Sequence, residues 1–294
     1  MLHLTRYRRV LVMAGVASLM LATSVSAGAS SLSGKYNAAD AKLVPSIYKG
    51  TTLQVATDAT YAPDESMNNG VMVGFDVDLM YAIAKTLDIK VKENNITFNS
   101  ILLGIGDNKF QIGNSSFTDE KSREKQVNFV DYFQAGEGVY AKSSSTAKFT
   151  GLKSFCGFTV AVESTTTEQS DAQKTAKACP ASKKLTVLSY PTQTEANLAV
   201  GSGHATFGFL DSQVAGYVVS QSQGEFKLVG KAIEVAPYGI ATPKTPNGKQ
   251  LAVAMQAAIK TLIANGTYGA ILKKYGVTAG GLPSSKIVLN GAIY

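Results

Sequence analysis

Short segments in which apolar and polar residues alternate are separated along this chain by longer segments with a helical apolar period. Residues 53–57 alternate as a half-buried strand does. After Gly74, the residues Leu79, Met80 and Ile83 recur on one face of a helix. The same pattern predicts the further strands 90–92, 111–113, 159–162, 185–188 and 205–210, and the helices 98–105, 168–178, 192–200, 248–264 and 267–275. Strands that alternate with helices are typical of an α/β sheet.

The alternation restarts after about residue 138, which predicts two α/β units. The last two helices end at Asn265-Gly266 and at Gly276, which are typical helix terminators. If these helices fold back onto the first unit, the second unit is inserted into the first. The small and polar stretch 28–50 precedes the first strand, and we expect it to be a flexible leader.

The first 27 residues have the pattern of a secretory signal peptide. Arg6, Arg8 and Arg9 form a charged region, and the apolar run 10–22 is too short to span a bilayer. The small residues 25–27 match a cleavage site. No cysteine lies at that site, so we expect a free product in the periplasm rather than a lipid-anchored one.

Removing the three arginines of the signal peptide lowers the formal net charge from +7 to +4. The other basic residues are scattered, which argues against nucleic-acid binding. The cysteines Cys156 and Cys179 would reach an oxidising compartment, so a disulfide is expected. His204 is the only histidine after the signal peptide, so a Cys/His zinc site cannot form, and we expect neither a metal nor a cofactor.

The stretch 113–123 combines a strand-like start, several hydroxyls and an arginine. We expect Thr118 to cap a helix whose first turn contains Asp119 and Glu120. Arg123 follows one turn later, so backbone N–H groups, hydroxyls and a guanidinium would converge on a small carboxylate. The alternative is a capped helix with a solvated arginine.

Six short motifs occur in the order found in the polar-amino-acid family of periplasmic solute-binding proteins, which are the receptors of ABC importers. They are 57–63 (Thr-Asp-Ala-Thr-Tyr-Ala-Pro), 73–79 (Val-Gly-Phe-Asp-Val-Asp-Leu), 115–118 (Ser-Ser-Phe-Thr) with Arg123, 160–167 (Val-Ala-Val-Glu-Ser-Thr-Thr-Thr), 210–212 (Leu-Asp-Ser), and 265–268 (Asn-Gly-Thr-Tyr) with 274–276 (Lys-Tyr-Gly). The chain resembles this family over residues 51–276.

The resemblance implies an α/β fold of the type 2 periplasmic-binding-protein class. Two lobes are joined by two crossover strands, and hinge closure traps a ligand between them. Lobe 1 would comprise residues 51–133 and 239–294, and lobe 2 residues 138–234. The ligand would lie at the strand and helix ends that face the cleft.

The resemblance also assigns binding roles to residues of this sequence. Arg123 would clamp the ligand α-carboxylate, assisted by Ser116 and Thr118. Thr167 would close on the same carboxylate from lobe 2, and Asp211 would accept the ligand ammonium. For each of these residues a purely structural role, as a surface arginine, a cap or a strand-end acid, is the alternative.

Tyr61 and Phe98 match the aromatic residues that sandwich the ligand side chain, although Phe98 could be a core residue instead. Asp58 and Glu163 match positions that touch that side chain in relatives.

Much of the family has Pro-Phe-Glu where this chain has Pro63-Asp64-Glu65. With Asp58 and Glu163, these carboxylates would form an acidic pocket that favours arginine, lysine or ornithine. Asp64 and Glu65 could instead point to solvent, which would leave a neutral ligand such as glutamine possible.

The resemblance therefore implies a monomeric, non-enzymatic receptor that binds an L-amino acid and docks on a membrane permease. Periplasmic dehydratases acting on prephenate-like acids share the fold, and they are the enzymatic alternative. Such an enzyme would keep Arg123 but would have no use for Asp211.

Overall fold

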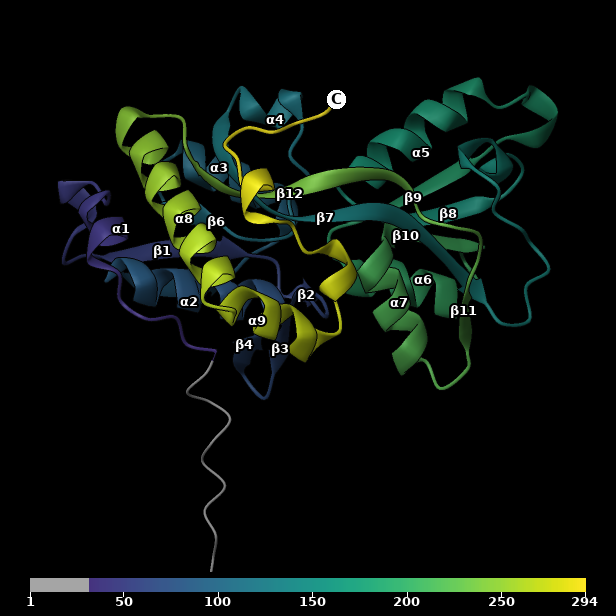
Figure 1. Cartoon of the computed structure of the whole chain (residues 1–294). Coiled ribbons are helices and arrows are strands. Elements are labelled where there is room, and N and C mark those ends of the chain that lie inside the picture. The colour runs from purple at the N-terminus through teal and green to yellow at the C-terminus, as the bar shows by residue number, and fades with distance from the viewer. Residues whose placement is uncertain (1–31) are drawn as a thin grey trace, which may run out of the picture. The chain divides into compact units, whose positions relative to one another are not determined.

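The computed structural model describes residues 32–294, and the predicted signal peptide at residues 1–27 lies outside them. The strands are β1 (Thr52–Thr57), β2 (Thr60–Tyr61), β3 (Glu65–Asn68), β4 (Val71–Val73), β5 (Lys90–Asn95), β6 (Ile112–Gly113), β7 (Val127–Lys142), β8 (Thr159–Glu163), β9 (Thr186–Tyr190), β10 (Phe207–Asp211), β11 (Phe226–Leu228) and β12 (Ile233–Pro243) (Figure 1). The α-helices are α1 (Ala38–Lys42), α2 (Phe75–Leu87), α3 (Phe98–Gly106), α4 (Lys121–Glu124), α5 (Thr167–Ala178), α6 (Gln193–Gly201), α7 (Ser212–Gln221), α8 (Pro246–Ala264) and α9 (Thr267–Tyr275). Short 3-10 helices are η1 (Ser46–Tyr48), η2 (Leu152–Phe155), η3 (Ala181–Lys183), η4 (Thr278–Gly280) and η5 (Ser284–Lys286).

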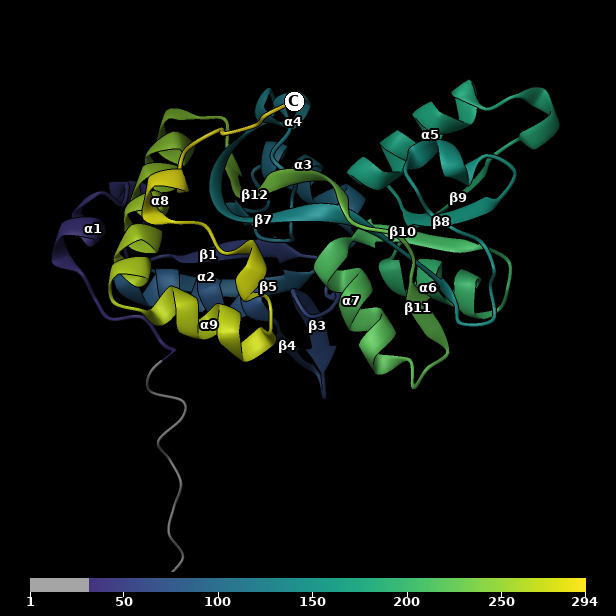
Figure 2. The ribbon, with the colours of Figure 1, turned by 45° about the vertical axis from the view of Figure 1, so that its right-hand side comes forward.

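Two long strands connect the two halves of the main sheet. Within residues 32–294 the strand order is β5-β1-β6-β12-β7-β10-β8-β9, and β11 also pairs with β7. The strands β1, β5 and β6 are parallel to one another, as are β8, β9 and β10. Between these sets, β7 and β12 run antiparallel and side by side in both ribbon views (Figures 1 and 2). This confirms the α/β fold with two crossover strands.

Separate hydrophobic cores form on the two sides of the crossover strands. On one side, α2, α8 and α9 bury residues such as Leu79, Met255 and Leu272 against the sheet. On the other side, the cores include Phe155 and Phe207 and involve β8, β10 and α5. The two cores account for two lobes, because each lobe buries its own apolar surface. The lobe boundaries near residues 133–138 and 234–239 stay a prediction.

The stretch 28–50 is not a flexible leader where the structure describes it. Asn37 accepts hydrogen bonds from the first backbone N–H groups of α1, and Asp40 accepts one from Thr261 at 2.7 Å. Val44 and Tyr48 are buried in the core beneath α2 and α8. The expectation of flexibility was wrong here, because Val44 and Tyr48 bury apolar surface and Asn37 and Asp40 hydrogen-bond to Thr86 and Thr261.

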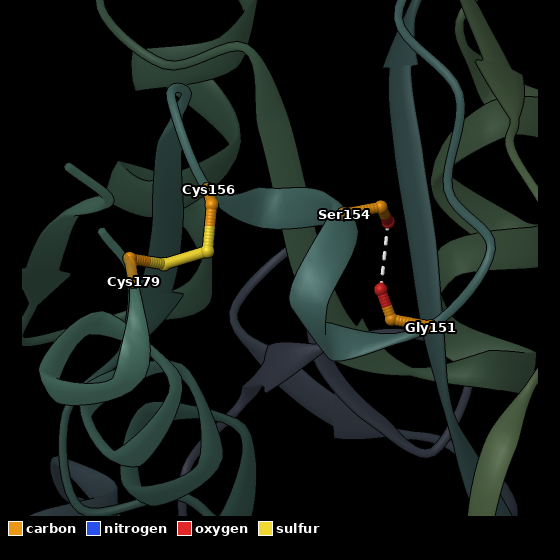
Figure 3. The surroundings of a disulfide bond; sticks show 4 residues. All are labelled: Gly151, Ser154, Cys156 and Cys179. Atoms are coloured by element: carbon orange, nitrogen blue, oxygen red, sulfur yellow. Dashed lines mark hydrogen bonds between the residues drawn. A yellow bond between two sulfur atoms is a disulfide. The ribbon is translucent and has the colours of Figure 1, made fainter. Parts of the chain in front are cut away.

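The predicted disulfide joins Cys156 and Cys179, whose Cα atoms lie 5.5 Å apart (Figure 3). Cys156 follows η2, and Cys179 directly follows α5. Beside it, the Ser154 hydroxyl donates a 2.6 Å hydrogen bond to the Gly151 carbonyl, which closes the turn that precedes Cys156. The disulfide therefore fixes the end of α5 to the segment that leads into β8.

In residues 32–294 the structure contains no helix with the length and hydrophobicity that a membrane span requires.

Candidate ligand-binding site

One pocket collects residues from both sides of the crossover strands. It holds about 310 Å³ of space free of protein atoms. The lining residues are Asp58, Tyr61, Glu65, Phe98, Ser115, Ser116, Thr118, Arg123, Glu163, Thr166, Thr167, Glu168 and Asp211. Ten of the eleven residues predicted from the sequence are among them.

Arg123 is the only arginine in residues 28–294, and it lies buried in this pocket with 8% of its surface exposed. Its Nη1 donates to the Thr118 carbonyl and its Nη2 to the Thr165 carbonyl, both at 2.9 Å. Its Nε lies 3.2 Å from a carboxylate oxygen of Glu120. The bond to Thr165 connects α4 to the loop before α5, so the guanidinium bridges the two lobes.

Two aromatic rings support the guanidinium of Arg123. Its central carbon lies 5.7 Å from the ring centre of Phe98 and 5.6 Å from that of Phe117. The two rings stack with their centres 4.5 Å apart. Flat aromatic faces favour a planar cation and restrict its rotation, so the arginine side chain is pre-oriented.

Thr118 does not cap a helix, contrary to the sequence-based expectation. It forms an isolated antiparallel bridge with Tyr238 of β12, and the next N–H, of Asp119, donates to Pro237. This pairing keeps the backbone extended, so the four-residue helix α4 begins only after Glu120, which supplies no side-chain cap. The carbonyl of Thr118 rather than its hydroxyl contacts Arg123.

Asp64 does not line the pocket. It is fully buried and accepts hydrogen bonds from the Ser116 hydroxyl at 3.0 Å and from Gln213 at 2.7 Å. Glu65 is also fully buried, but it reaches the pocket wall and accepts from the hydroxyl of Ser115 at 3.0 Å. The alternative that both carboxyls point to solvent is therefore wrong. Burial and the nearby Asp76 raise the pKa of both groups well above the usual range.

Ser116 holds its place through an unusual backbone conformation. Its φ of 48° lies in the left-handed region, and its N–H donates to the Asp76 carboxylate at 3.0 Å. Its hydroxyl already donates to Asp64. The hydroxyl therefore connects the pocket wall to the carboxyls behind it, a contact that the sequence analysis did not predict.

Asp211 lies at the end of β10, as the sequence predicted, and its pocket partner is Tyr61. The Tyr61 hydroxyl donates to Asp211 Oδ2 at 2.9 Å and accepts from the Asp211 N–H at 3.0 Å. Burial raises the pKa of Asp211 to about 7. Tyr61 packs among residues of the second lobe, including Leu210 and Val214, so it belongs to the contact between the lobes.

Asp58 positions Phe98 as well as lining the pocket. Its Oδ2 accepts from the Phe98 N–H at 2.9 Å, and its Oδ1 accepts from the N–H and the hydroxyl of Thr60. Glu163, at the end of β8, lines the same pocket as Asp58, and the charge of Asp58 raises its pKa. Both residues are buried.

The sequence analysis missed Ser115, Thr166 and Glu168. Glu168 is 1% exposed in the first turn of α5, and its Oε2 accepts from the Thr167 hydroxyl at 3.1 Å. Burial and the charge of Asp211 raise the pKa of Glu168 to about 8. Its position directly after Thr167, at a helix start predicted to face the cleft, was the available signal.

Carboxyl groups outnumber cations in the pocket. Arg123 is the single basic side chain among the lining residues. No group of three or more His, Cys, Asp or Glu side chains within residues 32–294 has the arrangement that a metal ion requires. The five lining carboxyls are Asp58, Glu65, Glu163, Glu168 and Asp211.

The chain is similar in sequence and in structure to known amino-acid-binding proteins. The Arginine-binding protein ArgT of Corynebacterium glutamicum is 30% identical over 223 residues, which are 75% of this chain and 72% of that protein. An ancestral arginine-binding protein solved with bound arginine has a TM-score of 0.71 and 31% identity, covering 76% of this chain and 97% of that chain. An ancestral arginine-binding protein bound to glutamine gives a TM-score of 0.71 and 30% identity, covering 77% of this chain and 98% of that chain.

The family model described as bacterial extracellular solute-binding proteins, family 3, matches residues 53–278. This match extends over both lobes and includes every residue that lines the pocket. The chain therefore belongs to the bacterial extracellular solute-binding proteins, family 3.

Proposed function

We propose that this protein is a receptor that binds an L-amino acid with a cationic side chain outside the cytoplasmic membrane and delivers it to the permease of an ABC importer. The observation that carries the proposal is the composition of the pocket, which is lined by five buried carboxyl groups and one guanidinium. An amino acid's carboxylate neutralises the guanidinium, so the surrounding acids favour a ligand with further positive charge. Arginine, lysine and ornithine each supply an ammonium group and a second cation.

Arg123 is suited to hold the ligand carboxylate. A guanidinium has five N–H groups; two of them donate to the carbonyls of Thr118 and Thr165, and the Nε group faces the carboxylate of Glu120 as an ion pair. The other two have no protein partner within residues 32–294, and they can bind a carboxylate as a fork. Ser116 and Thr118 from lobe 1 and Thr167 from lobe 2 line the same pocket and stay the predicted helpers of Arg123.

Asp211 is the proposed acceptor of the ligand ammonium. It lies at the end of a buried strand, and Arg123 is close enough to lower its pKa. A zwitterionic head group would thus meet a cation and an anion in one pocket. A prephenate-like acid offers no cation to Asp211, so the arrangement gives no support to the dehydratase alternative.

Hinge movement of the two lobes is part of the proposal. The predicted lobes, residues 51–133 with 239–294 and residues 138–234, meet through Arg123–Thr165 and Tyr61–Asp211. These contacts hold the two walls of the pocket together. The lobes must therefore separate about the crossover strands β7 and β12 to admit an amino acid.

Glutamine is the second candidate ligand, since a similar ancestral arginine-binding protein has been solved with glutamine bound. Calorimetric titration of ligand-stripped protein against arginine, lysine, ornithine, histidine, glutamine, glutamate and prephenate tests the proposal. We expect tight binding of the cationic ligands, with Kd in the micromolar range or below, about 8 kcal/mol or more. Preference for glutamine would contradict the proposed cationic ligand but not the receptor. Binding of prephenate alone would contradict the receptor and favour the enzymatic alternative.

A further inference from the structure

Two acidic side chains from opposite lobes meet in the pocket. Asp58 directly follows β1, and Glu163 is the last residue of β8. Both side chains line the same pocket and are only 2% and 3% exposed, and the charge of Asp58 raises the pKa of Glu163. Two carboxylates without a cation between them repel strongly when buried. The pair therefore requires a proton or another positive group.

Asp58 is the better solvated anion of the two. Its oxygens accept hydrogen bonds from the Thr60 N–H at 3.0 Å, the Thr60 hydroxyl at 2.7 Å and the Phe98 N–H at 2.9 Å. These bonds lower the pKa of Asp58 against the upward effect of its burial. Glu163 has no comparable support, because its Oε1 finds no hydrogen-bond partner within the described part of the chain. A shared proton therefore belongs mainly to Glu163.

Among the described residues that line the pocket, Arg123 is the only basic side chain, and it already contacts Glu120, Thr118 and Thr165. Burial and the charge of Asp58 raise the pKa of Glu163 well above its usual value, and Glu168 and Asp211 raise it further. The titratable groups that face the pair are Glu65 and Tyr61 from lobe 1 and Glu168 and Asp211 from lobe 2.

We propose that Asp58 and Glu163 share one proton across the cleft, and that the cationic side chain of the ligand takes the place of this proton. Binding of a cationic amino acid then releases one proton from Glu163 to the solvent. This inference rests on the proposed function, since it concerns the side-chain end of the same ligand. This exchange distinguishes cationic from neutral ligands, because a neutral side chain does not displace the proton from the pair.

The sign of the pH dependence follows from the competition between ligand and proton. Below the pKa of Glu163 the ligand must displace a bound proton, so its affinity falls as the pH is lowered. One released proton corresponds to an affinity change of at most about tenfold per pH unit. Citrulline has nearly the shape of arginine but an uncharged urea group, so its binding should lack this contribution.

The experiment measures proton release by calorimetry in buffers of different ionisation enthalpy, with arginine and citrulline as ligands. Both ligands carry the same carboxylate and ammonium, so any proton released near Asp211 or Glu168 contributes equally to both. We expect arginine to release about one proton more than citrulline, or than glutamine if citrulline binds too weakly, below the pKa of Glu163.

The variant Glu163→Gln keeps the size and hydrogen-bonding capacity of the side chain but cannot release a proton. We expect it to remove the difference in proton release between arginine and citrulline. Glu225→Gln is the matched control, because Glu225 is exposed and lies outside the pocket. It should retain the full difference.

The outcomes separate the inference from the proposed function. Tight arginine binding with equal proton release for arginine and citrulline would overturn the shared proton and leave the receptor for cationic amino acids intact. An undiminished difference in Glu163→Gln would also overturn it, since the proton would then come from another group. Failure of arginine, lysine and ornithine to bind would overturn the proposed cationic ligand, and the proton exchange with it.

Discussion

The Tyr61 hydroxyl makes two hydrogen bonds to Asp211, donating to its carboxylate at 2.9 Å and accepting from its backbone N–H at 3.0 Å. The two residues are 150 positions apart in the sequence, and they come from β2 and β10. One hydroxyl thus satisfies both a buried carboxylate and the N–H at the end of a strand. This contact connects the two lobes at the predicted ammonium site.

Replacing Tyr61 by phenylalanine removes both bonds and leaves the Asp211 N–H without its partner. We expect the free energy of unfolding to fall by about 1–3 kcal/mol, the usual cost of an unsatisfied buried polar group. Urea unfolding measures this change. Tyr217→Phe is the control, because Tyr217 is exposed and its hydroxyl makes no hydrogen bond within residues 32–294. Equal stability of the two variants would contradict the structural role of the contact.

Arg123→Ala should abolish measurable amino-acid binding, because no other basic side chain of residues 32–294 lines the pocket. Arg123→Lys should also bind poorly, since an ammonium group cannot contact two carbonyls and a carboxylate with the geometry of a guanidinium. Calorimetry measures the binding, and circular dichroism checks that each variant is folded. Lys121→Ala, an exposed change on the same helix, should bind as the unmodified protein does. Folded Arg123→Ala with unchanged affinity would disprove the site assignment.

Stability of the ligand-free protein should decrease as the pH rises from about 5 to about 9. Burial raises the pKa of Glu168 to about 8, of Asp131 to about 9 and of Glu137 to about 10. In the unfolded chain these groups titrate near pH 4. The folded protein therefore holds more protons throughout this window, and raising the pH favours unfolding.

Urea midpoints across this pH window test the expected slope. Glu137→Gln should flatten the slope and raise stability at the alkaline end, because the amide keeps the neutral form of a buried side chain that is 4% exposed. Glu225→Gln, at an exposed position, should leave the slope unchanged. Stability that stays constant or rises with pH would show that the folded protein holds no extra protons on these carboxyls.

Loss of the Cys156–Cys179 bond should reduce stability by about 3 kcal/mol, as expected for a loop of this length. The double variant Cys156→Ser/Cys179→Ser, compared with the oxidised protein by urea unfolding, measures the effect. Thiol titration of the unreduced, denatured protein should find no free thiol. Two free thiols per chain would refute the bond in the purified protein.

The sequence predicted local elements well where the apolar pattern was long or the terminators were clear. The predicted helix 267–275 coincides with α9, and the predicted strand 159–162 differs from β8 only by its last residue, Glu163. Such segments are determined by near neighbours in the chain, namely apolar spacing and glycine at the end of a helix.

The predictions that failed concern residues whose partners lie far away in the sequence. The cap expected at Thr118 gives way to pairing with β12, more than a hundred residues further along. Asp64 does not line the pocket, and its carboxylate accepts hydrogen bonds from Ser116 and from Gln213 of the other lobe. Neither helix propensity nor a count of charged residues can predict such long-range partners. The acidic lining of the pocket, by contrast, could be predicted from the positions of acidic residues in the family motifs.

The charge of the ligand side chain is the central claim, and a comparison of arginine with citrulline tests it most directly. Calorimetric titration of ligand-stripped protein with both compounds at neutral pH isolates that charge, because the two molecules are nearly isosteric. The account predicts that arginine binds at least about 100-fold more tightly, a difference of about 2.7 kcal/mol or more. Equal affinities, or tighter binding of citrulline, would contradict it.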